Sequence, residues 1–424
     1  MEHLVNFPSS KNMTKKIWIL GRGKLLKNQK LGPITRFSAM AEIAQKNSFH
    51  PIVVLDSVSP EASVTFETME LRTFRSEMIE PGSPVILNPH LPWKVLIPLI
   101  LRKIPFDLDS HGIGALEAME SESSLSSFRR FQGRRRYAQR MRLLLHSCER
   151  VYVSIPEQAA VFGGMLFRES RNSDISLSSR LPAKTIFAPM GIHYGTFPEK
   201  TKDLENKNGR PIFLWGGGIW SWFDIPTLIQ AFKILKDQGN QAILYFLTDG
   251  NPSGLSSQDK PVQKAKEIAS ALGLLNSNVF FHPGSVSPEE LPRHLKICRA
   301  GILSNPATLE SLASWRTRLL DLLWAGKPAI VSGNDPLSSL MQEHGCATIV
   351  SQGDSAALAA ALAHIAEDDE SWRSMCKSAT ALGSQLDWNA TLNGAVEHWK
   401  HWKPQVSFPI HQRIGAILRC LAGF

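Results

Sequence analysis

The stretch that decides the fold is Ser304–Asp335, SNPATLESLASWRTRLLDLLWAGKPAIVSGND. It predicts a loop, an amphipathic helix, a Gly-Lys-Pro turn and a buried strand. The helix is expected to end at Ala325-Gly326, because glycine suits a C-terminal cap and Pro328 cannot continue a helix. In open α/β sheets, ligands bind just beyond strand ends and at helix N-termini. The stretch therefore predicts a ligand site in an α/β domain.

The alternation of strand and helix occurs twice along the chain. Apolar segments such as Lys15–Leu20 (KKIWIL) and Pro211–Trp215 (PIFLW) each begin a series of strands and helices, a pattern typical of parallel βαβ units. Between the two series lies the polar segment Pro198–Arg210, which we interpret as an interdomain linker. The pattern predicts two Rossmann-like halves around a cleft. The expected domains are residues 1–198, residues 199–404 and a helical tail at residues 405–424.

The composition is that of a globular chain. The 424 residues are 43% hydrophobic and 20% charged, enough for large buried cores. The five cysteines are scattered without a CxxC pair, which argues against a disulfide framework or a zinc site and fits a reducing compartment. The sequence has neither the basic-then-apolar order of a signal peptide nor a run of about 18 apolar residues. We therefore expect a cytoplasmic protein.

The net charge of +9 comes from the N-terminal half, which holds 27 Lys and Arg against 18 Asp and Glu. Much of the excess lies in one cluster, Arg129–Arg142 (RRFQGRRRYAQRMR). The cluster is either a solvated helix face or a surface for an anionic membrane or an anionic acceptor such as a lipid-linked diphosphate. In the second case the protein would lie peripherally at the inner face of the membrane. We expect no nucleic-acid partner, since no helix-turn-helix, zinc-finger or RNA-recognition signature occurs.

A glycine-rich turn within Leu214–Asp224 (LWGGGIWSWFD) separates a predicted strand from a predicted helix. Gly216, Gly217 and Gly218 permit positive φ and let the backbone approach a ligand closely, and the helix N-terminus that follows could hold a phosphate. The spacing is not the GxGxxG of a dinucleotide site. The tryptophans of this turn, Trp220 among them, either pack the cleft or offer a stacking platform for a base or a sugar.

Four charged side chains of Ser304–Asp335 are the strongest candidates for a site. Glu310 could hydrogen-bond sugar hydroxyls or stabilise a developing positive charge, or it could simply complement the helix dipole. Arg316 and Arg318 lie at i and i+2 and should face different sides of the predicted helix. One of them could clamp a diphosphate bidentately, and the other could pair with Asp321.

In the first half, the segment DLDSHG places Asp107, Asp109 and His111 at the end of a strand. Glu117 follows on a predicted helix. This position suits chemistry at a cleft, although a lone histidine is as often structural. The two aspartates have Asp-x-Asp spacing, but their place beside His111 in the first half does not point to a metal site on a nucleotide diphosphate.

Arg36 follows Gly32-Pro33 near the start of the first predicted helix. It could bind an anionic leaving group or acceptor, or it could be a surface arginine. Elsewhere the sequence contains no HExxH, GxSxG or GxxxxGK[ST] motif. The metalloprotease, serine hydrolase and P-loop classes are therefore not expected.

Four segments, in order along the chain, resemble one family. They are LGPITRFSAMAEIA (Leu31–Ala44), PFDLDSHG (Pro105–Gly112), FAPMGI (Phe187–Ile192) and RTRLLDLLWAGKPAIVSGND (Arg316–Asp335). The sequence thereby resembles GT-B glycosyltransferases of the glycogen-synthase-like, usually retaining superfamily, in a family 4-like subgroup. The resemblance implies two Rossmann-like doubly wound domains facing a cleft, with C-terminal helices packing back on the N-terminal domain.

The resemblance also implies a function. A sugar would move from a nucleotide-diphosphate donor to a glycan or lipid-linked acceptor in surface-polysaccharide synthesis, with retention and without a metal or other cofactor. The N-terminal domain would hold the acceptor and the C-terminal domain the donor. His111 and Glu310 would be catalytic. The implied donor residues are Gly216, Gly217, Gly218, Trp220, Arg316, Arg318 and Asp321, and the implied acceptor or cleft residues are Gly32, Arg36, Asp109 and Glu117.

Two departures from the family pattern keep alternatives open. Family members usually carry an Arg and a Lys in the glycine turn, where this sequence has Gly218 and Phe223. The usual paired glutamates lie eight residues apart, but Ala313 is eight residues before Asp321, while Glu310 is eleven before it. The alternatives are a non-catalytic binding protein, or an epimerase or phosphorylase on the same fold.

Overall fold

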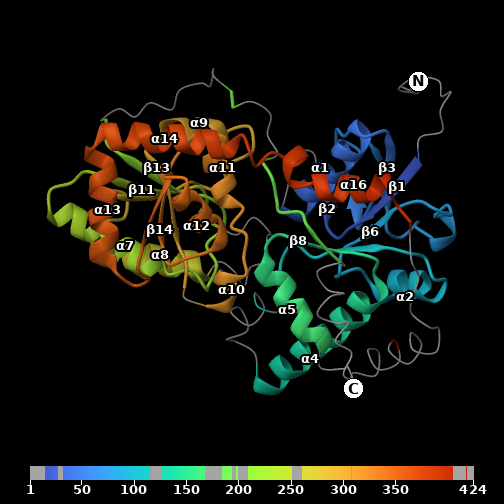
Figure 1. Cartoon of the computed structure of the whole chain (residues 1–424). Coiled ribbons are helices and arrows are strands. Elements are labelled where there is room, and N and C mark those ends of the chain that lie inside the picture. The colour runs from blue at the N-terminus through green and yellow to red at the C-terminus, as the bar shows by residue number, and fades with distance from the viewer. Residues whose placement is uncertain are drawn as a thin grey trace.

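The computed structural model describes residues 15–26, 32–114, 116, 126–167, 184–192, 197–198, 209–250, 260–306, 308–403 and 417. These residues form two α/β lobes, each around one large parallel sheet (Figure 1). Most of the predicted linker (residues 199–208), the helix residue Glu117 and nearly all of the predicted tail lie outside the described residues. The domain boundaries therefore stay a prediction.

The described part of the N-terminal sheet has seven strands in the order β5-β3-β1-β6-β7-β8-β9, paired in parallel throughout. Most of them are apolar and buried, as expected where helices cover both faces of a sheet. Their bounds are β1 (Lys15–Leu20), β3 (Phe49–Leu55), β5 (Glu67–Glu70), β6 (Val85–Leu87), β7 (Asp107–Asp109), β8 (Val151–Val153) and β9 (Thr185–Phe187). Two short strands, β2 (Lys24–Leu25) and β4 (Ser57–Val58), pair separately.

The described helices of this domain include α4, which carries the basic cluster. Their bounds are α1 (Gly32–Lys46), the 3-10 turn η1 (Ser76–Met78), α2 (Trp93–Leu101), α4 (Ser127–Ser147) and α5 (Pro156–Phe167). Helix α4 begins at a serine N-cap, since the Ser126 side chain accepts a hydrogen bond from the backbone N–H of Arg129.

The C-terminal sheet repeats the same winding. Its described strands lie in the order β12-β11-β10-β13-β14-β15, which is 3-2-1-4-5-6 in chain order, and the N-terminal sheet follows the same pattern with a seventh strand at its end. The direction of winding reverses between β10 and β13, and crevices at such switch points bind ligands. The bounds are β10 (Ile212–Trp215), β11 (Ile243–Phe246), β12 (Val279–Phe281), β13 (Ala300–Ser304), β14 (Ala329–Ser332) and β15 (Ala347–Val350).

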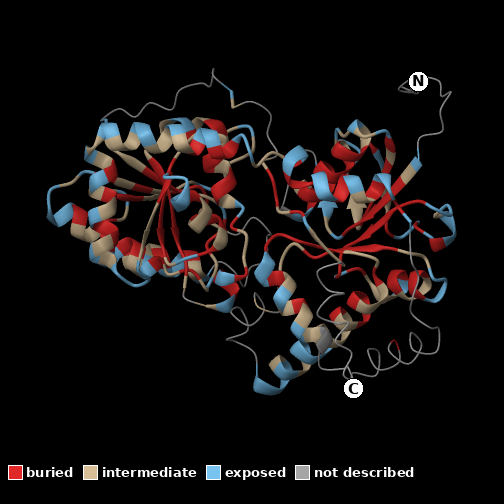
Figure 2. Cartoon of the chain, viewed as in Figure 1, coloured by how far each residue is buried: buried red, intermediate tan, exposed pale blue. Residues whose placement is uncertain are grey.

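Helices cover both faces of this sheet, and the strands between them are buried (Figure 2). Their bounds are α7 (Ile225–Asp237), α8 (Lys260–Ala271), α9 (Leu291–Ile297), α10 (Leu309–Leu312), α11 (Arg318–Trp324), α12 (Pro336–Glu343), α13 (Ser355–Glu367), α14 (Asp369–Gly383), α15 (Trp388–Thr391) and α16 (Asn393–Lys400). The described helices include none with the length and hydropathy that a bilayer crossing needs.

The last helices return to the N-terminal domain, as predicted. In Figure 1, α16 lies over the lobe that contains β1 and β3. The indole N–H of Trp399 donates to the Tyr152 hydroxyl at 2.7 Å, and the Trp399 ring packs edge-on against Phe49. Because Trp399 is fully buried, these contacts make α16 a part of the N-terminal core.

The prediction of one helix after Ser304 is wrong. The structure has two short helices, α10 and α11, separated by residues 313–317. Helix α10 begins with the side chain of Thr308 capping the N–H of Ser311 and ends at Ala313. Helix α11 packs closely on β13 because Gly301 has no side chain, and a Cβ there would clash with Leu322. Arg316 therefore lies in a loop, while Arg318 begins α11.

Candidate functional site

The glycine-rich turn follows β10 at the switch point of the C-terminal sheet. Gly217 has φ +74°, a conformation that favours glycine, as the sequence predicted. The nearest atoms to a Cβ at Gly216 or Gly217 would belong to Arg318, at 3.9 Å. The turn is thus lined by one cationic side chain from α11. Helix α7 starts just beyond it, capped by Asp224, whose carboxylate accepts from the N–H of Thr227 at 3.3 Å.

Arg318 reaches back over this turn. Its Nη2 donates to the carbonyl of Gly218 at 3.4 Å, and its guanidinium lies 4.9 Å from the ring centre of Trp215 and 4.5 Å from that of Phe223. Its Nη1 is enclosed and has no hydrogen-bond partner among the described residues. Burial and the nearby charge of Arg316 lower the pKa of Arg318 to about 9. An anion bound here would restore the stability of the charged form.

Arg316 is already paired. Its Nη1 and Nη2 donate to the two oxygens of Glu310 at 3.0 and 2.5 Å, and Nη2 also donates to the hydroxyl of Ser311 at 3.1 Å. Both charged side chains are buried, so the pair is a fork-on-fork salt bridge shielded from water. The prediction that one of the two arginines pairs with Asp321 is wrong for Arg316, which holds Glu310 instead.

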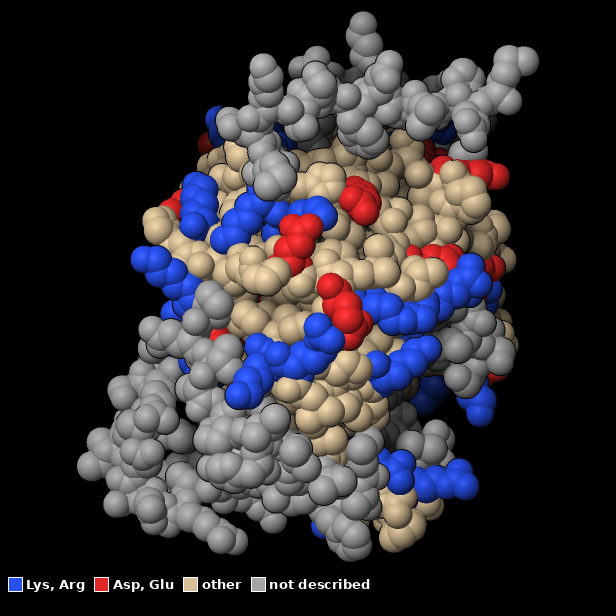
Figure 3. Space-filling view, turned by 90° about the vertical axis from the view of Figure 1, so that its right-hand side faces the viewer, with Lys and Arg blue, Asp and Glu red and all other residues tan. Residues whose placement is uncertain are grey.

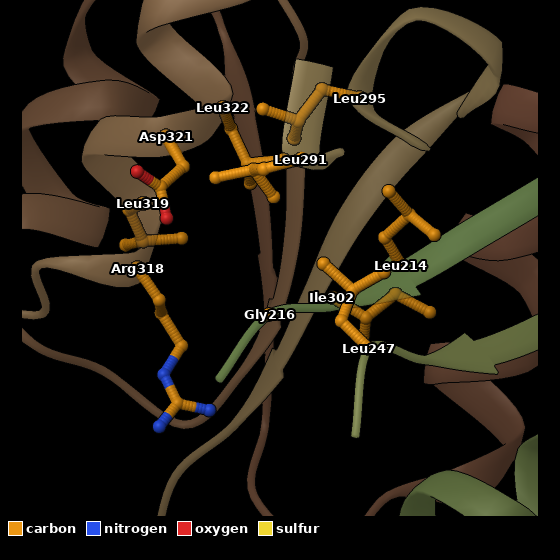
Figure 4. A pocket seen from close by; sticks show the side chains of 10 residues that line it. All are labelled: Leu214, Gly216, Leu247, Leu291, Leu295, Ile302, Arg318, Leu319, Asp321 and Leu322. Carbon is orange, nitrogen blue, oxygen red and sulfur yellow. The ribbon is translucent and has the colours of Figure 1, made fainter. Parts of the chain in front are cut away.

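Asp321 does not form an ion pair with Arg318 within the described part of the chain. In Figure 4 the guanidinium of Arg318 points away from the carboxylate of Asp321. Burial raises the pKa of Asp321 to about 7, although the positive charge of Arg318 opposes that shift. Both residues line a small pocket (Figure 4) whose other walls are Leu214, Gly216, Leu247, Leu291, Leu295, Ile302, Leu319 and Leu322.

Two further residues of this site were not predicted. The carboxylate of Asp335 caps the N-terminus of α12 through the N–H of Ser338 at 3.1 Å and accepts from the amide of Asn305 at 2.8 Å. Burial raises the pKa of Asp335, and the neighbouring Arg316 opposes that rise. The Asp-Pro sequence at the start of α12 is a usual helix N-cap signal, and it could have revealed Asp335.

The tryptophans of the glycine turn have different environments. Trp215 is fully buried and its ring packs against the guanidinium of Arg318, so it offers no open face to a base. Trp220 and Trp222 stack on each other, with ring centres 5.2 Å apart, and are only partly buried. Of the two interpretations, packing is right for Trp215, while Trp220 keeps an exposed part at the turn.

On the N-terminal side, Asp109 joins two of the predicted residues. Its carboxylate accepts from Nε of Arg36 at 2.8 and 2.9 Å, and lies 3.4 Å from Nδ1 of His111. Burial alone would raise the pKa of Asp109, but Arg36 and His111 hold it well below its usual range. His111 is partly exposed at the end of β7. The three residues therefore form a line from the core to the cleft surface.

One of the two alternatives for Arg36 is wrong. Arg36 is fully buried and pairs with Asp109, so it is not a surface arginine. Asp107 and Asp109 alternate along β7 and face opposite sides, so they cannot converge on one ion. Asp107 instead meets Tyr152 and His398, and its burial raises its pKa.

The C-terminal half of the chain matches one family model. Residues 196–381, which include the glycine turn and α11, match the family model described as glycosyl transferases group 1. This part of the chain is similar to the group 1 glycosyl transferases. A sequence search of curated proteins finds no match.

Solved structures that are similar to this chain cover nearly all of it. Sucrose-phosphate synthase from Thermosynechococcus elongatus has a TM-score of 0.63 at 16% identity, covering 91% of this chain and 98% of that one. WaaG, a glycosyltransferase involved in lipopolysaccharide biosynthesis, has 0.60 at 14%, with 90% and 98% covered. HepE from Anabaena, in complex with UDP and glucose, has 0.57 at 14%, with 92% and 100% covered. These likenesses confirm the predicted GT-B fold.

The remaining predicted site residues are Gly32 and Glu117. Gly32 is the first residue of α1, and Glu117 is outside the described residues. The basic cluster lies on α4, where Phe128 and Phe131 are 68% and 60% exposed between the arginines. Figure 3 shows basic side chains in a band over the N-terminal lobe, with fewer acidic ones between them. No three His, Cys, Asp or Glu side chains in the described ranges are arranged to hold a metal ion.

Proposed function

We propose that this chain transfers a sugar from a nucleotide-diphosphate donor to a glycan or lipid-linked acceptor, with retention and without a metal ion or other cofactor. The observation that carries the proposal is the guanidinium of Arg318 over the glycine turn at the β10–β13 switch point. A diphosphate in this crevice would meet the guanidinium and the N-terminus of α7.

Arg318 also explains how the site can work without the usual clamp. The family's Arg and Lys positions are Gly218 and Phe223 in this chain. Both contact Arg318, since Gly218 supplies the carbonyl that accepts from its Nη2, and Phe223 supplies a ring beneath its guanidinium. The Phe223 ring thus supports an arginine that comes from another element, α11. That arginine would neutralise the charge that develops on the departing diphosphate, which is the role a metal ion plays elsewhere.

The two catalytic candidates would act from opposite sides. Glu310 would hold donor hydroxyls with the lone pairs that Arg316 leaves free, since a carboxylate can accept about four hydrogen bonds. Asp109 faces Nδ1 of His111, which favours a proton on that nitrogen and leaves Nε2 to accept a hydrogen bond from the sugar. Asp321, Trp220 and Gly32 would line the donor and acceptor ends of the same cleft.

The acceptor side supports a surface-polysaccharide or glycolipid role. WaaG, one of the similar structures, acts in lipopolysaccharide biosynthesis. Helix α4 presents arginines together with two exposed phenylalanines, Phe128 and Phe131, a combination suited to an anionic lipid surface. We therefore place the chain in the cytoplasm, peripherally at the inner face of the membrane, where it would meet a lipid-linked acceptor.

The test is a thermal-shift screen of the purified chain against UDP, GDP, ADP, CMP and dTDP, with UDP first because HepE was solved with it. Stabilisation by one nucleotide would identify the donor class, and Arg318→Met should abolish the shift. The matched control is Arg299→Met, because Arg299 also lies over a tryptophan, 4.4 Å from the ring of Trp372, but away from the glycine turn. If no nucleotide stabilises the wild type, the chain is a non-catalytic member of the fold.

A further inference from the structure

The loop between α10 and α11 touches the other domain. We call residues Ala313–Trp315 the contact loop. Ala313 is buried within the hydrophobic cluster of the N-terminal domain, together with residues of β6 and α4 such as Leu87 and Met141. The indole N–H of Trp315 donates to the carbonyl of Met190 at 3.0 Å. The loop therefore belongs to the C-terminal chain segment but packs on the N-terminal domain.

Gln158 makes the second connection. It is fully buried in the first turn of α5, where its Oε1 accepts from the N–H of Ser154 at 2.7 Å. Its Nε2 donates to two carbonyls, that of His111 at 3.2 Å and that of Ala313 at 3.0 Å. An amide nitrogen has two N–H groups, so both are used. One N–H group bonds the N-terminal domain at His111, and the other bonds the contact loop at Ala313.

The residues that flank the contact loop are those of the candidate site. Glu310 and Arg316 lie on either side of it and are joined by their bidentate salt bridge. This bridge closes the segment into a ring, so that the loop and the pair must move as one body. On the other side, Gln158 binds the backbone of His111 itself rather than a neighbour.

We propose that Gln158 and Trp315 are positioning residues that fix Glu310 and His111 at a set spacing across the cleft, by holding the contact loop against the N-terminal domain. This proposal rests on the function proposed above, because the spacing matters only if Glu310 and His111 both contact the donor sugar. The two hydrogen bonds to Ala313 and Met190 exist only while the domains stand in the present arrangement. Separation of the domains would break both bonds and exchange them for bonds to water, so the contacts favour the present arrangement.

The test compares Trp315→Phe with Trp372→Phe. Both changes remove an indole N–H that donates to a carbonyl and keep an aromatic ring, but the partner of Trp372 is Arg299, within the C-terminal domain, at 2.6 Å. Hydrogen exchange in peptides spanning residues 309–318 should be at least about tenfold faster in Trp315→Phe, with a larger radius of gyration by X-ray scattering. Trp372→Phe should leave both unchanged. Gln158→Leu should reproduce the effect of Trp315→Phe.

The outcomes separate this proposal from the proposed function. If Trp315→Phe and Gln158→Leu match Trp372→Phe in exchange and in scattering, the positioning role is wrong, whether or not a nucleotide binds. Should the exchange change in a chain that binds none of the five nucleotides, the interdomain role stands and the transferase assignment fails. Where UDP does bind, its affinity should fall several-fold in Trp315→Phe at an unchanged melting temperature, which a merely structural role would not produce. Gln158→Glu, which keeps the acceptor for Ser154, serves if Gln158→Leu does not fold.

Discussion

The two sheets wind in the same order, yet their glycine turns are used differently. The turn after β1 is filled, because Gly21 lies directly against the ring of Phe37 and a Cβ there would clash with it. The turn after β10 has no apolar side chain within reach of Gly216 or Gly217, only Arg318 at 3.9 Å. The same strand order therefore does not give the two turns the same surroundings. What differs is the residue that a neighbouring helix directs at the turn, which is Phe37 of α1 in the first case and Arg318 of α11 in the second.

The largest expected effect tests the filled turn. Gly21→Ala should lower the free energy of unfolding by about 1–3 kcal/mol, because the added methyl group overpacks against Phe37. Gly216→Ala should change it by less than about 0.5 kcal/mol, since the nearest atom lies 3.9 Å away. Urea denaturation of both variants measures the difference. Equal losses would contradict the contrast between the two turns.

The second prediction concerns the cation. Arg318→Met should weaken nucleotide-diphosphate binding by about 10- to 100-fold, the loss typical of a charge-assisted pair. Stability should stay level or rise, because burial lowers the pKa of this arginine to about 9 and its charge is costly in the unliganded fold. Calorimetric titration measures the affinity. An affinity equal to that of Arg299→Met would exclude Arg318 from the site.

The third prediction is a pH dependence at the same pocket. Because the pKa of Asp321 is raised to about 7, the folded protein binds its proton more tightly than the unfolded chain does. The stability contributed by the protonated form is complete below about pH 4 and is lost as the pH rises through about 7. Asp321→Asn should therefore gain stability relative to the wild type as the pH rises from 5 to 7, by on the order of 1 kcal/mol per pH unit. Melting temperatures at these pH values measure it, and a constant difference would contradict it.

The smallest expected effect concerns the surfaces of the two domains. A double substitution of Phe128 and Phe131 to serine should reduce binding to anionic vesicles by roughly tenfold, because each exposed ring can bury only part of its area in the headgroup region. The matched control replaces Leu309 and Leu312, which are 68% and 51% exposed on α10 of the other lobe. Co-sedimentation measures both. Equal losses, or binding insensitive to salt, would contradict a basic membrane surface on α4.

The sequence predicted what depends on local pattern. Alternating strands and helices predicted both sheets, and glycine with Pro328 after α11 predicted where that helix ends. The break between α10 and α11 could not be predicted, because the bonds that hold the loop come from Gln158 and Met190, more than a hundred residues away. The periodicity of the stretch is equally compatible with one continuous helix, and only these distant contacts decide between the two.

The same limit applies to the site. Glu310, Arg316 and Arg318 were predicted as candidates, but their partners were not. Which arginine meets the glycine turn depends on Gly301, which lets α11 sit close to β13, and on the ring of Phe223. Likewise, the burial of Arg36 follows from its pairing with Asp109, which lies 73 residues later in the chain.

The return of α16 to the N-terminal domain has a mechanical consequence. The chain crosses between the lobes twice, once after Met190 and once between α14 and α15. The two crossings lie side by side, because the N–H of Ile192 donates to the carbonyl of Leu386 at 2.8 Å and Ile192 also pairs with Asp387. Two adjacent chain crossings act as a hinge. They resist sliding and twisting, so we expect any opening of the lobes to be a rotation about Ile192 and Leu386–Asp387.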